Sequence, residues 1–236
     1  MNGLLKRVAA RLPPKLRRRI RKGHLHRQFL RTTDADEPEP EYHHLPEWVK
    51  PGDRAIDVGA NIGQYTRKLS ELVGKTGRVF AFEPVPETFE ILATNMATLP
   101  LQNVTLFNAA ASDRAGIVGM AMPSDASGMQ NIYQAAITRD ASGFAVFGFP
   151  LDAIQPQVRV SLVKIDAEGH EHSVLLGMRA IMERDHPVLI VECPTHETKA
   201  MLVGLGYRVR TYAKSPNVVF SCAAVAEALP AWSDRG

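Results

Sequence analysis

One short segment of the chain combines glycines and carboxylates in a spacing that could bind a nucleoside. It runs from Asp57 through Gly59 and Asn61 to Gly63, and Glu83 stands 20 residues beyond its last glycine. Glycine permits a tight turn and lets the backbone approach a ligand closely. An acid at this distance is placed to accept hydrogen bonds from the two hydroxyls of a ribose. The spacing predicts an adenosine-containing cofactor.

The residue between the two glycines separates two classes of cofactor. A dinucleotide-binding turn carries a glycine where Asn61 stands, so that a helix N-terminus can meet the pyrophosphate. S-adenosylmethionine has no phosphate, and its sulfonium and ammonium groups are positive, which suits Asp57 nearby. We therefore expect S-adenosylmethionine, with Gly59 and Gly63 admitting it against the backbone. A nicotinamide-dependent dehydrogenase is a more distant alternative.

A second segment, residues 163–171, places three acids and a histidine where a strand turns into a helix. Side chains grouped in this way could line a ligand site, and His170 is the natural proton acceptor of the group near neutral pH. Glu171 could instead stabilise the start of the helix. Carboxylates crowd here, but no dedicated metal-ligand spacing is visible, and no metal is expected.

The elements that must position these residues alternate between strand and helix. Apolar runs predict strands at residues 54–58, 79–82, 104–107, 161–165, 187–191, 207–212 and 218–222. Apolar residues at helical spacing predict helices over 62–72, 89–99, 173–182 and 198–205. This pattern predicts a doubly wound α/β fold: a mostly parallel seven-stranded sheet, helices on both faces and an antiparallel last strand.

In an open sheet of this kind, ligands bind at the carboxyl ends of the strands. Asn108 and Asp113 follow the third strand, where they could serve the adenine pocket or be ordinary turn residues. Residues 114–152 interrupt the alternation and predict an inserted β-hairpin. Its loop, residues 123–140, is a candidate cover over the methyl acceptor.

Taken together, these motifs resemble the FkbM family of S-adenosylmethionine-dependent methyltransferases. The resemblance covers roughly residues 50 to 195. It implies a class I methyltransferase fold and O-methylation of a hydroxyl on a small molecule or saccharide. Methyl transfer to a hydroxyl needs positioning and a proton acceptor. The candidate catalytic residues are then Asp166, Glu168 and His170, and Asp166 is, like Asn61, also a candidate contact of the cofactor. The matching segments are residues 56–63, Phe82-Glu83-Pro84, Leu151-Asp152, residues 162–171 and Glu192.

Charge is unevenly distributed along the chain. Of 28 basic and 25 acidic residues, eleven basic residues and no acid fall within residues 1–31, which leaves 17 − 25 = −8 for the rest. We expect residues 1–41 to be a basic arm and an acidic linker, partly disordered or amphipathic, ahead of a methyltransferase domain at 42–236. Leu4, Leu5, Val8 and Leu12 could form one helical face, which Pro13-Pro14 would end early.

The basic arm admits three interpretations. A solvated tail is one, and weak docking to an anionic membrane surface or an acidic partner is another. Nucleic-acid contact or a transit peptide is the third. The acidic core argues against nucleic acid, which is not expected as a partner. Two cysteines and no apolar run long enough to span a bilayer favour a cytoplasmic protein, with any membrane contact peripheral. The alternatives to a small-molecule O-methyltransferase are a nucleic-acid methyltransferase and a non-catalytic cofactor-binding protein.

Overall fold

A seven-stranded sheet forms the centre of the computed structural model, which describes residues 13–121, 136–138, 144–154 and 158–222. The strand order is β10-β11-β9-β8-β1-β2-β3. Only β11 runs antiparallel to its neighbours, so the predicted doubly wound sheet with an antiparallel last strand is confirmed. The strands are β1 Arg54–Val58, β2 Arg78–Phe82, β3 Val104–Phe107, β8 Val160–Ile165, β9 Val188–Glu192, β10 Tyr207–Thr211 and β11 Asn217–Cys222.

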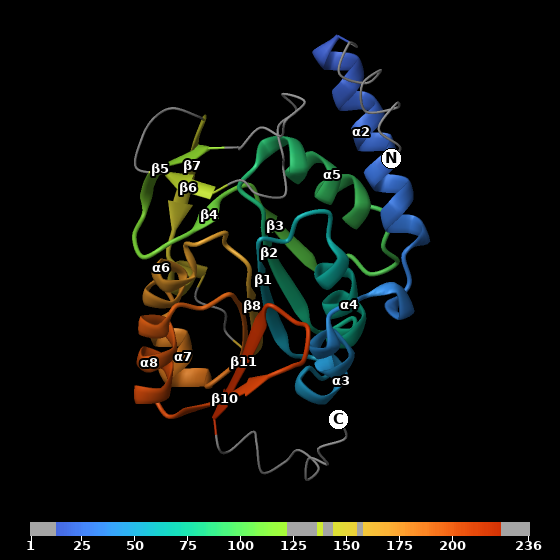
Figure 1. The fold of residues 1–236 in the computed structure, drawn as a ribbon. Helices are drawn as coiled ribbons and strands as arrows, with labels where there is room; N and C mark the ends of the chain where they lie inside the picture. Colours follow the sequence, from blue (N-terminus) through green and yellow to red (C-terminus); the bar gives the residue numbers. More distant parts are fainter. Residues whose placement is uncertain (1–12, 122–135, 139–143, 155–157, 223–236) are drawn as a thin grey trace.

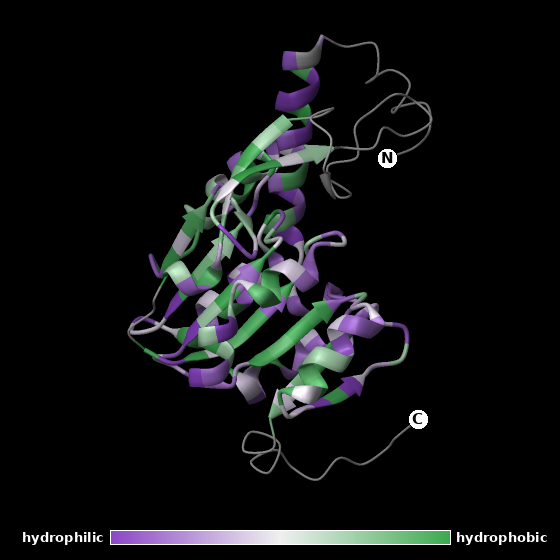
Figure 2. Cartoon of the chain, turned by 90° about the vertical axis from the view of Figure 1, so that its left-hand side faces the viewer, coloured by the Kyte–Doolittle hydropathy of each residue, from purple (hydrophilic) through white to green (hydrophobic). Residues whose placement is uncertain are grey.

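Helices cover both faces of this sheet (Figure 1). On one face, α6, α7 and α8 pack on alternate residues of the central strands such as Val163 and Leu189. On the other, α3 and α4 pack on the intervening residues such as Leu162 and Ile190. Figure 2 shows the resulting apolar strands between more polar helices. The helices are α3 Leu45–Trp48, α4 Gln64–Val73, α5 Pro86–Met96, α6 Glu171–Leu176, α7 Arg179–Asp185 and α8 His196–Gly204, with short 3-10 turns at Asp34–Asp36, Pro40–His44 and Leu151–Ile154.

The helix expected over residues 173–182 is instead two helices. Helix α6 ends before Gly177 and α7 begins at Arg179. A Cβ at Gly177 would stand 1.9 Å from the carbonyl oxygen of Ser112, so the chain passes this neighbour at a distance that only glycine allows. The break is a consequence of that close tertiary contact, which helical periodicity does not report.

A second sheet of four strands stands beside the carboxyl edge of the first (Figure 1). Its order is β4-β7-β5-β6, with β4 Ala110–Ala111, β5 Gly116–Ala121, β6 Ala136–Thr138 and β7 Phe144–Phe149. The predicted hairpin is confirmed, because β5 and β7 pair antiparallel, but β4 and β6 widen it into a sheet. Apart from β6, the expected cover loop lies outside the described residues.

The described part of the chain before β1 is folded onto the domain. Pro14 starts a helix, α2 Pro14–Arg31, because proline suits the first helical position. The helical face expected from Leu4, Leu5, Val8 and Leu12, before Pro13-Pro14, lies outside the described residues. Leu25 and Phe29 are buried by this helix against α5. The acidic segment that follows also packs inward, with Glu41 and Tyr42 buried. Across the part of the chain that is described, none of the helices has the length and apolar character needed to cross a bilayer.

Candidate active site

A pocket opens between the two sheets, at the carboxyl ends of β1, β2 and β8. It contains the glycine turn after β1, the acid after β2 and the acids after β8. Thus the two sequence motifs, more than 100 residues apart, face one cavity, as parallel strands require. The residues lining it are Val58, Gly59, Asn61, Phe82, Glu83, Pro84, Val85, Ala109, Ala110, Ala111, Met120, Asp166, Ala167 and Glu168.

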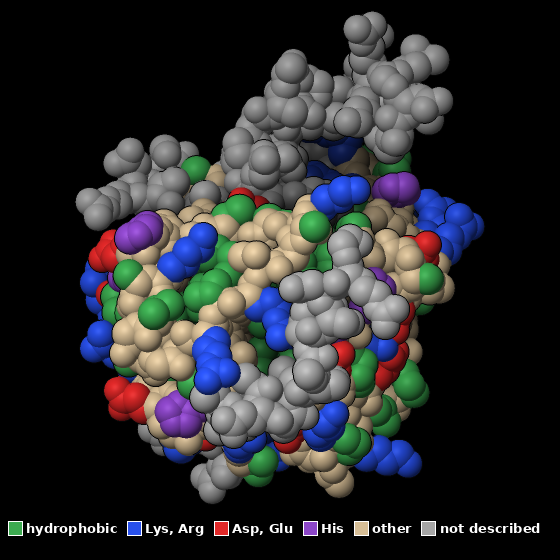
Figure 3. All heavy atoms as spheres, turned by 60° about the horizontal axis from the view of Figure 1, so that its bottom comes forward, with side chains coloured by type: hydrophobic (Ala, Val, Ile, Leu, Met, Phe, Trp, Pro, Cys, Tyr) green, Lys and Arg blue, Asp and Glu red, His purple; other side chains and the backbone are tan. Residues whose placement is uncertain are grey.

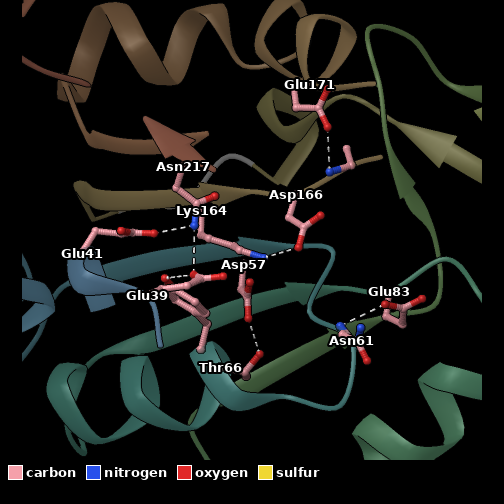
Figure 4. A network of polar contacts seen from close by, with 12 residues as sticks. Glu39, Glu41, Asp57, Asn61, Thr66, Glu83, Lys164, Asp166, Glu171 and Asn217 are labelled. Carbon is pink, nitrogen blue, oxygen red and sulfur yellow. Dashed lines mark hydrogen bonds and ion pairs between the residues drawn. The ribbon is translucent and has the colours of Figure 1, made fainter. Parts of the chain in front are cut away.

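Glu83 lies in the pocket wall and has a relative solvent exposure of only 5%. Its Oε2 accepts a hydrogen bond from the backbone N–H of Asn61 at 3.0 Å (Figure 4), and its Oε1 accepts one from the backbone N–H of Val85 at 2.9 Å. Burial raises its pKa to about 7, against the lowering effect of those two bonds. A carboxylate has about four acceptor positions, so Glu83 keeps the capacity to accept from a ribose.

The two glycines of the first motif do different things. Gly59 lines the pocket at φ +75°, and a Cβ there would stand 1.9 Å from the carbonyl oxygen of Asp166. Gly63, at φ +99°, faces the side chains of Met96 and Leu92 and does not line the pocket. The expected approach to a ligand therefore fits Gly59, whereas Gly63 is needed for packing between α4 and α5.

Asp57 lies beneath the pocket and not in its wall. It has no exposed surface, and its Oδ2 accepts a hydrogen bond from Thr66 Oγ1 at 2.5 Å. Burial raises its pKa, while the charge of Lys164, its register partner on β8, lowers it. Asp57 therefore lies beside the buried ammonium of Lys164, and its contact with a cofactor stays a prediction.

Lys164 links this buried layer to the pocket. Its Nζ donates to Asp166 Oδ2 at 2.8 Å and lies 5.2 Å from the centre of the Tyr65 ring. Although burial opposes the charge, Asp166 and Asp57 raise the pKa of Lys164. The ion pair with Asp166 gives this buried lysine a partner of opposite charge. Glu39, from the segment before β1, adds a further acid by accepting from Tyr65 and Asn217 (Figure 4).

Asp166 also shares a hydrogen bond with Glu192, which ends β9. That bond, together with burial, raises the pKa of Glu192 to about 8. The pKa of Asp166 is lowered, because Lys164 and the bond from Glu192 outweigh its burial. The opposite shifts are those of a carboxyl pair that shares one proton and titrates as a unit.

Glu168 is the most exposed acid of the pocket wall, and its backbone has φ +49°, unusual for a residue with a side chain. The turn is held by Glu171, whose Oε1 accepts from the backbone N–H groups of Ala167 and Gly169 at 3.1 and 3.0 Å. Burial and the neighbouring Asp166 raise the pKa of Glu168. Glu171 is therefore structural, and Glu168 presents a basic carboxylate to the pocket.

The remaining predicted residues lie outside the pocket wall. His170 Nε2 is 3.0 Å from Ser112 Oγ, and burial lowers its pKa. Asn108 donates its amide to the carbonyl oxygens of Glu83 and Pro84, so it supports the Glu83 turn. Asp113 is paired with Arg114 at the surface. None of the three side chains lines the cavity formed by the described residues.

Three carboxylates of the site could together contact a cation. Asp166, Glu168 and Glu192 each offer an oxygen within 4.8 Å of the others. Carboxylate oxygens suit Mg²⁺ or Ca²⁺. Two of the three already share a proton, and Lys164 supplies a positive charge at 2.8 Å, so the cluster is neutralised in part by the protein itself.

Several wall residues carried no signal in the sequence. Ala109, Ala110 and Ala111 border the pocket with their small side chains, and Met120 reaches it from β5. The signal for Glu39 was indirect: a lysine inside a buried strand needs acidic partners, and one of the acids near Lys164, Glu39, comes from outside the expected domain.

The strand order and the pocket at the carboxyl ends of the strands are those of the class I methyltransferase fold. A family model described as the methyltransferase FkbM domain matches residues 57–209, and the chain belongs to this family. The resemblance expected from the motifs is thereby confirmed. Methyltransferase FkbM from Methylobacillus flagellatus KT superimposes with a TM-score of 0.52 and 20% identity, covering 77% of this chain and 50% of that one.

Two curated relatives are similar in sequence. The hexuronic acid methyltransferase AglP of Haloferax volcanii is 29% identical over 146 residues, which are 62% of this chain and 58% of that protein. Protein-L-isoaspartate O-methyltransferase 1 of Archaeoglobus fulgidus is 33% identical over 58 residues, 25% of this chain and 27% of that protein. The chain thus spans less than two thirds of the length of these relatives.

Proposed function

We propose that the protein is an S-adenosylmethionine-dependent O-methyltransferase that acts on a hydroxyl of a small molecule or saccharide. The observation that carries the proposal is the position of Glu83 and Glu168 in the wall of one pocket. The first suits a ribose diol, and the second suits a hydroxyl that must lose its proton. A saccharide is the acceptor class we favour, because the name of the Haloferax relative specifies a hexuronic acid.

The residues of the pocket fit the cofactor. Glu83 would accept from the ribose hydroxyls, while the backbone at Gly59 allows close approach and the alanines 109–111 leave room for a flat base. The side-chain oxygen of Asn61 is buried without a hydrogen-bond partner among the described residues. Because buried acceptors are normally paired, a donor group of the bound cofactor would complete this site. When bound, S-adenosylmethionine supplies an electrophilic methyl group on its sulfonium.

Glu168 is the better proton acceptor of the two pocket acids. Asp166 is held ionised by Lys164 and by the proton on Glu192, so its basicity is low. Glu168 has a raised pKa and an exposed carboxylate, which favour taking a proton from an acceptor hydroxyl. Asp166 would then orient that hydroxyl. His170 is engaged with Ser112 and takes no part in this assignment.

Mass spectrometry tests the proposed reaction. The protein is incubated with isotopically labelled S-adenosylmethionine and a panel of saccharides, uronic acids and hydroxylated metabolites. We expect one acceptor to gain a single methyl group. Formation of S-adenosylhomocysteine with no acceptor modified at oxygen would contradict O-methylation. Calorimetry that detects binding of neither S-adenosylmethionine nor S-adenosylhomocysteine would contradict the proposed cofactor.

Variants of the pocket acids test the roles. Glu83→Ala should abolish cofactor binding, and Glu168→Gln should lower kcat about 100-fold or more while cofactor binding is kept. Glu197→Gln, whose side chain is 82% exposed on α8, is the matched control and should behave as the wild type. Full turnover by both Asp166→Asn and Glu168→Gln would mean that the acidic turn is structural.

A further inference from the structure

One face of α2 stands apart from the domain and carries apolar and basic side chains together. Leu16, Ile20 and Leu30 are 43%, 47% and 56% exposed. Leu16, Arg19, Ile20, Gly23 and Arg27 line one surface hollow, which places them on a common side of the helix. We call this stripe, with Leu30, the outer face of α2. Exposed apolar residues at helical spacing flanked by arginines form an amphipathic surface.

The opposite side of α2 is fixed to the domain. Leu25 and Phe29 are buried, His26 Nδ1 lies 2.6 Å from Asn95 Oδ1, and Arg67 donates to the Phe29 carbonyl oxygen at 3.0 Å. Figures 1 and 2 show the N-terminal half of the helix extending past the end of the domain. The outer face is therefore held in place before any partner binds, and no folding of the helix has to accompany binding.

The charge of α2 is of one sign. Its 18 residues contain eight Lys and Arg and no acid. Arg18 and Arg21 pair with Glu90 and Glu87 of α5. The other six, which have no acidic partner among the described residues, are Lys15, Arg17, Arg19, Lys22, Arg27 and Arg31. On the face of the molecule seen in Figure 3, by contrast, basic, acidic and apolar side chains are interspersed.

We propose that the outer face of α2 docks the protein on an anionic lipid membrane. Unpaired basic residues complement anionic headgroups, and Leu16, Ile20 and Leu30 can enter the boundary between headgroups and acyl chains. A nucleic acid would use the charges but gains nothing from three exposed aliphatic side chains, so the composition of this face favours lipid. Residues 32–236 carry a net charge of −8, so an anionic membrane repels them. The membrane attracts residues 1–31, which include α2.

Flotation of the full-length protein with lipid vesicles tests the proposal. One set of vesicles is phosphatidylcholine alone, and in the other about one third is phosphatidylserine. We expect binding at least about tenfold stronger to the anionic vesicles, and a strong decrease as salt is raised. Equal binding to both sets, or binding to neither, would overturn the proposal.

Two double variants separate the apolar and the charged contributions. Leu16→Ser with Ile20→Ser should lower binding to anionic vesicles about tenfold at unchanged charge. Arg19→Glu with Arg27→Glu should abolish it. Full vesicle binding by the serine variant would contradict the docking, since it keeps every basic residue of the chain. All four side chains point away from the packed side, so circular dichroism and thermal unfolding should match the wild type.

Matched controls change the same residue types elsewhere. Val203→Ser with Leu205→Ser removes two aliphatic side chains that are 52% and 41% exposed near α8. Arg208→Glu with Lys214→Glu reverses two exposed charges around β10. Both should bind vesicles as the wild type does. Binding of single-stranded RNA that depends on Arg19 and Arg27 but not on Leu16 and Ile20, without vesicle binding, would assign the face to nucleic acid instead.

Discussion

The carboxylate of Glu83 accepts a hydrogen bond from the backbone N–H of Asn61, 22 residues earlier in the chain, at 3.0 Å. The acid after β2 therefore shapes the glycine turn after β1, in addition to facing the pocket. The same carboxylate accepts from Val85 and so fixes its own turn as well. The glycine turn and Glu83, which are separate features of the sequence, are thus joined by a hydrogen bond into one structural unit.

Cofactor affinity should depend on pH through Glu83. Its pKa is raised to about 7, and a ribose diol needs the ionised acceptor. The ionised fraction therefore rises between pH 6 and pH 8, and we expect affinity for S-adenosylhomocysteine to rise by up to about tenfold over that range. Calorimetry at several pH values measures this. Glu83→Gln should bind weakly with a flat profile, and a wild-type affinity independent of pH would contradict the role.

Stability should also change with pH through Glu192. Its folded pKa, raised to about 8, exceeds its ordinary value of 4.5, so the folded state holds a proton that the unfolded state releases. This contribution is fully present below about pH 4.5 and is lost as pH rises through 8. We expect the melting temperature of the wild type to fall between pH 6 and pH 9 more steeply than that of Glu192→Gln. Parallel profiles would show that the shared proton does not matter for folding.

Loss of the buried ammonium should be costly. Lys164→Met leaves Asp57 and Asp166 buried without their positive partner, and we expect a loss of about 3 to 5 kcal/mol in the free energy of unfolding. Urea denaturation measures it. Arg114→Met breaks an ion pair in which the arginine side chain is 84% exposed, and it should cost less than about 1 kcal/mol. Similar losses in the two variants would contradict the importance of the buried network.

Two glycines with left-handed backbones should differ sharply in their tolerance of alanine. Gly169→Ala meets no atom within 4 Å, so it adds only backbone strain, about 1 to 2 kcal/mol. Gly59→Ala adds a Cβ 1.9 Å from the Asp166 carbonyl oxygen and should cost about 4 kcal/mol or more, or prevent folding. Thermal unfolding of both proteins compares them. An equal, small effect would mean that β1 and β8 can separate without penalty.

Much of the fold followed from local sequence patterns. Apolar runs identified the seven strands of the large sheet and their positions along the chain, because buried strands and amphipathic helices differ in the period of their apolar residues. The glycine turn, Glu83 and the Asp166–Glu168 turn were found as pocket candidates because polar residues at strand ends are exceptional in a buried sheet.

What the sequence could not provide were the contacts between distant segments. Asp57 and Lys164 are both polar residues in buried strands, and only strand register brings them together beneath the pocket. The sequence pattern also carried no signal for α2, a helix that Pro14 starts and that the packing of Phe29 on α5 stabilises.

The sequence by itself therefore determined which residues end the strands, and so the class of fold and the edge that carries the chemistry. Tertiary structure decided which of those residues face the cavity: Glu83, Asp166 and Glu168 do, whereas Asp57 and His170 are engaged elsewhere. The physical reason is that periodicity is a property of one segment. Orientation into a shared pocket, and the pKa values of Glu83 and Glu192 there, arise from burial and partners that several segments supply together.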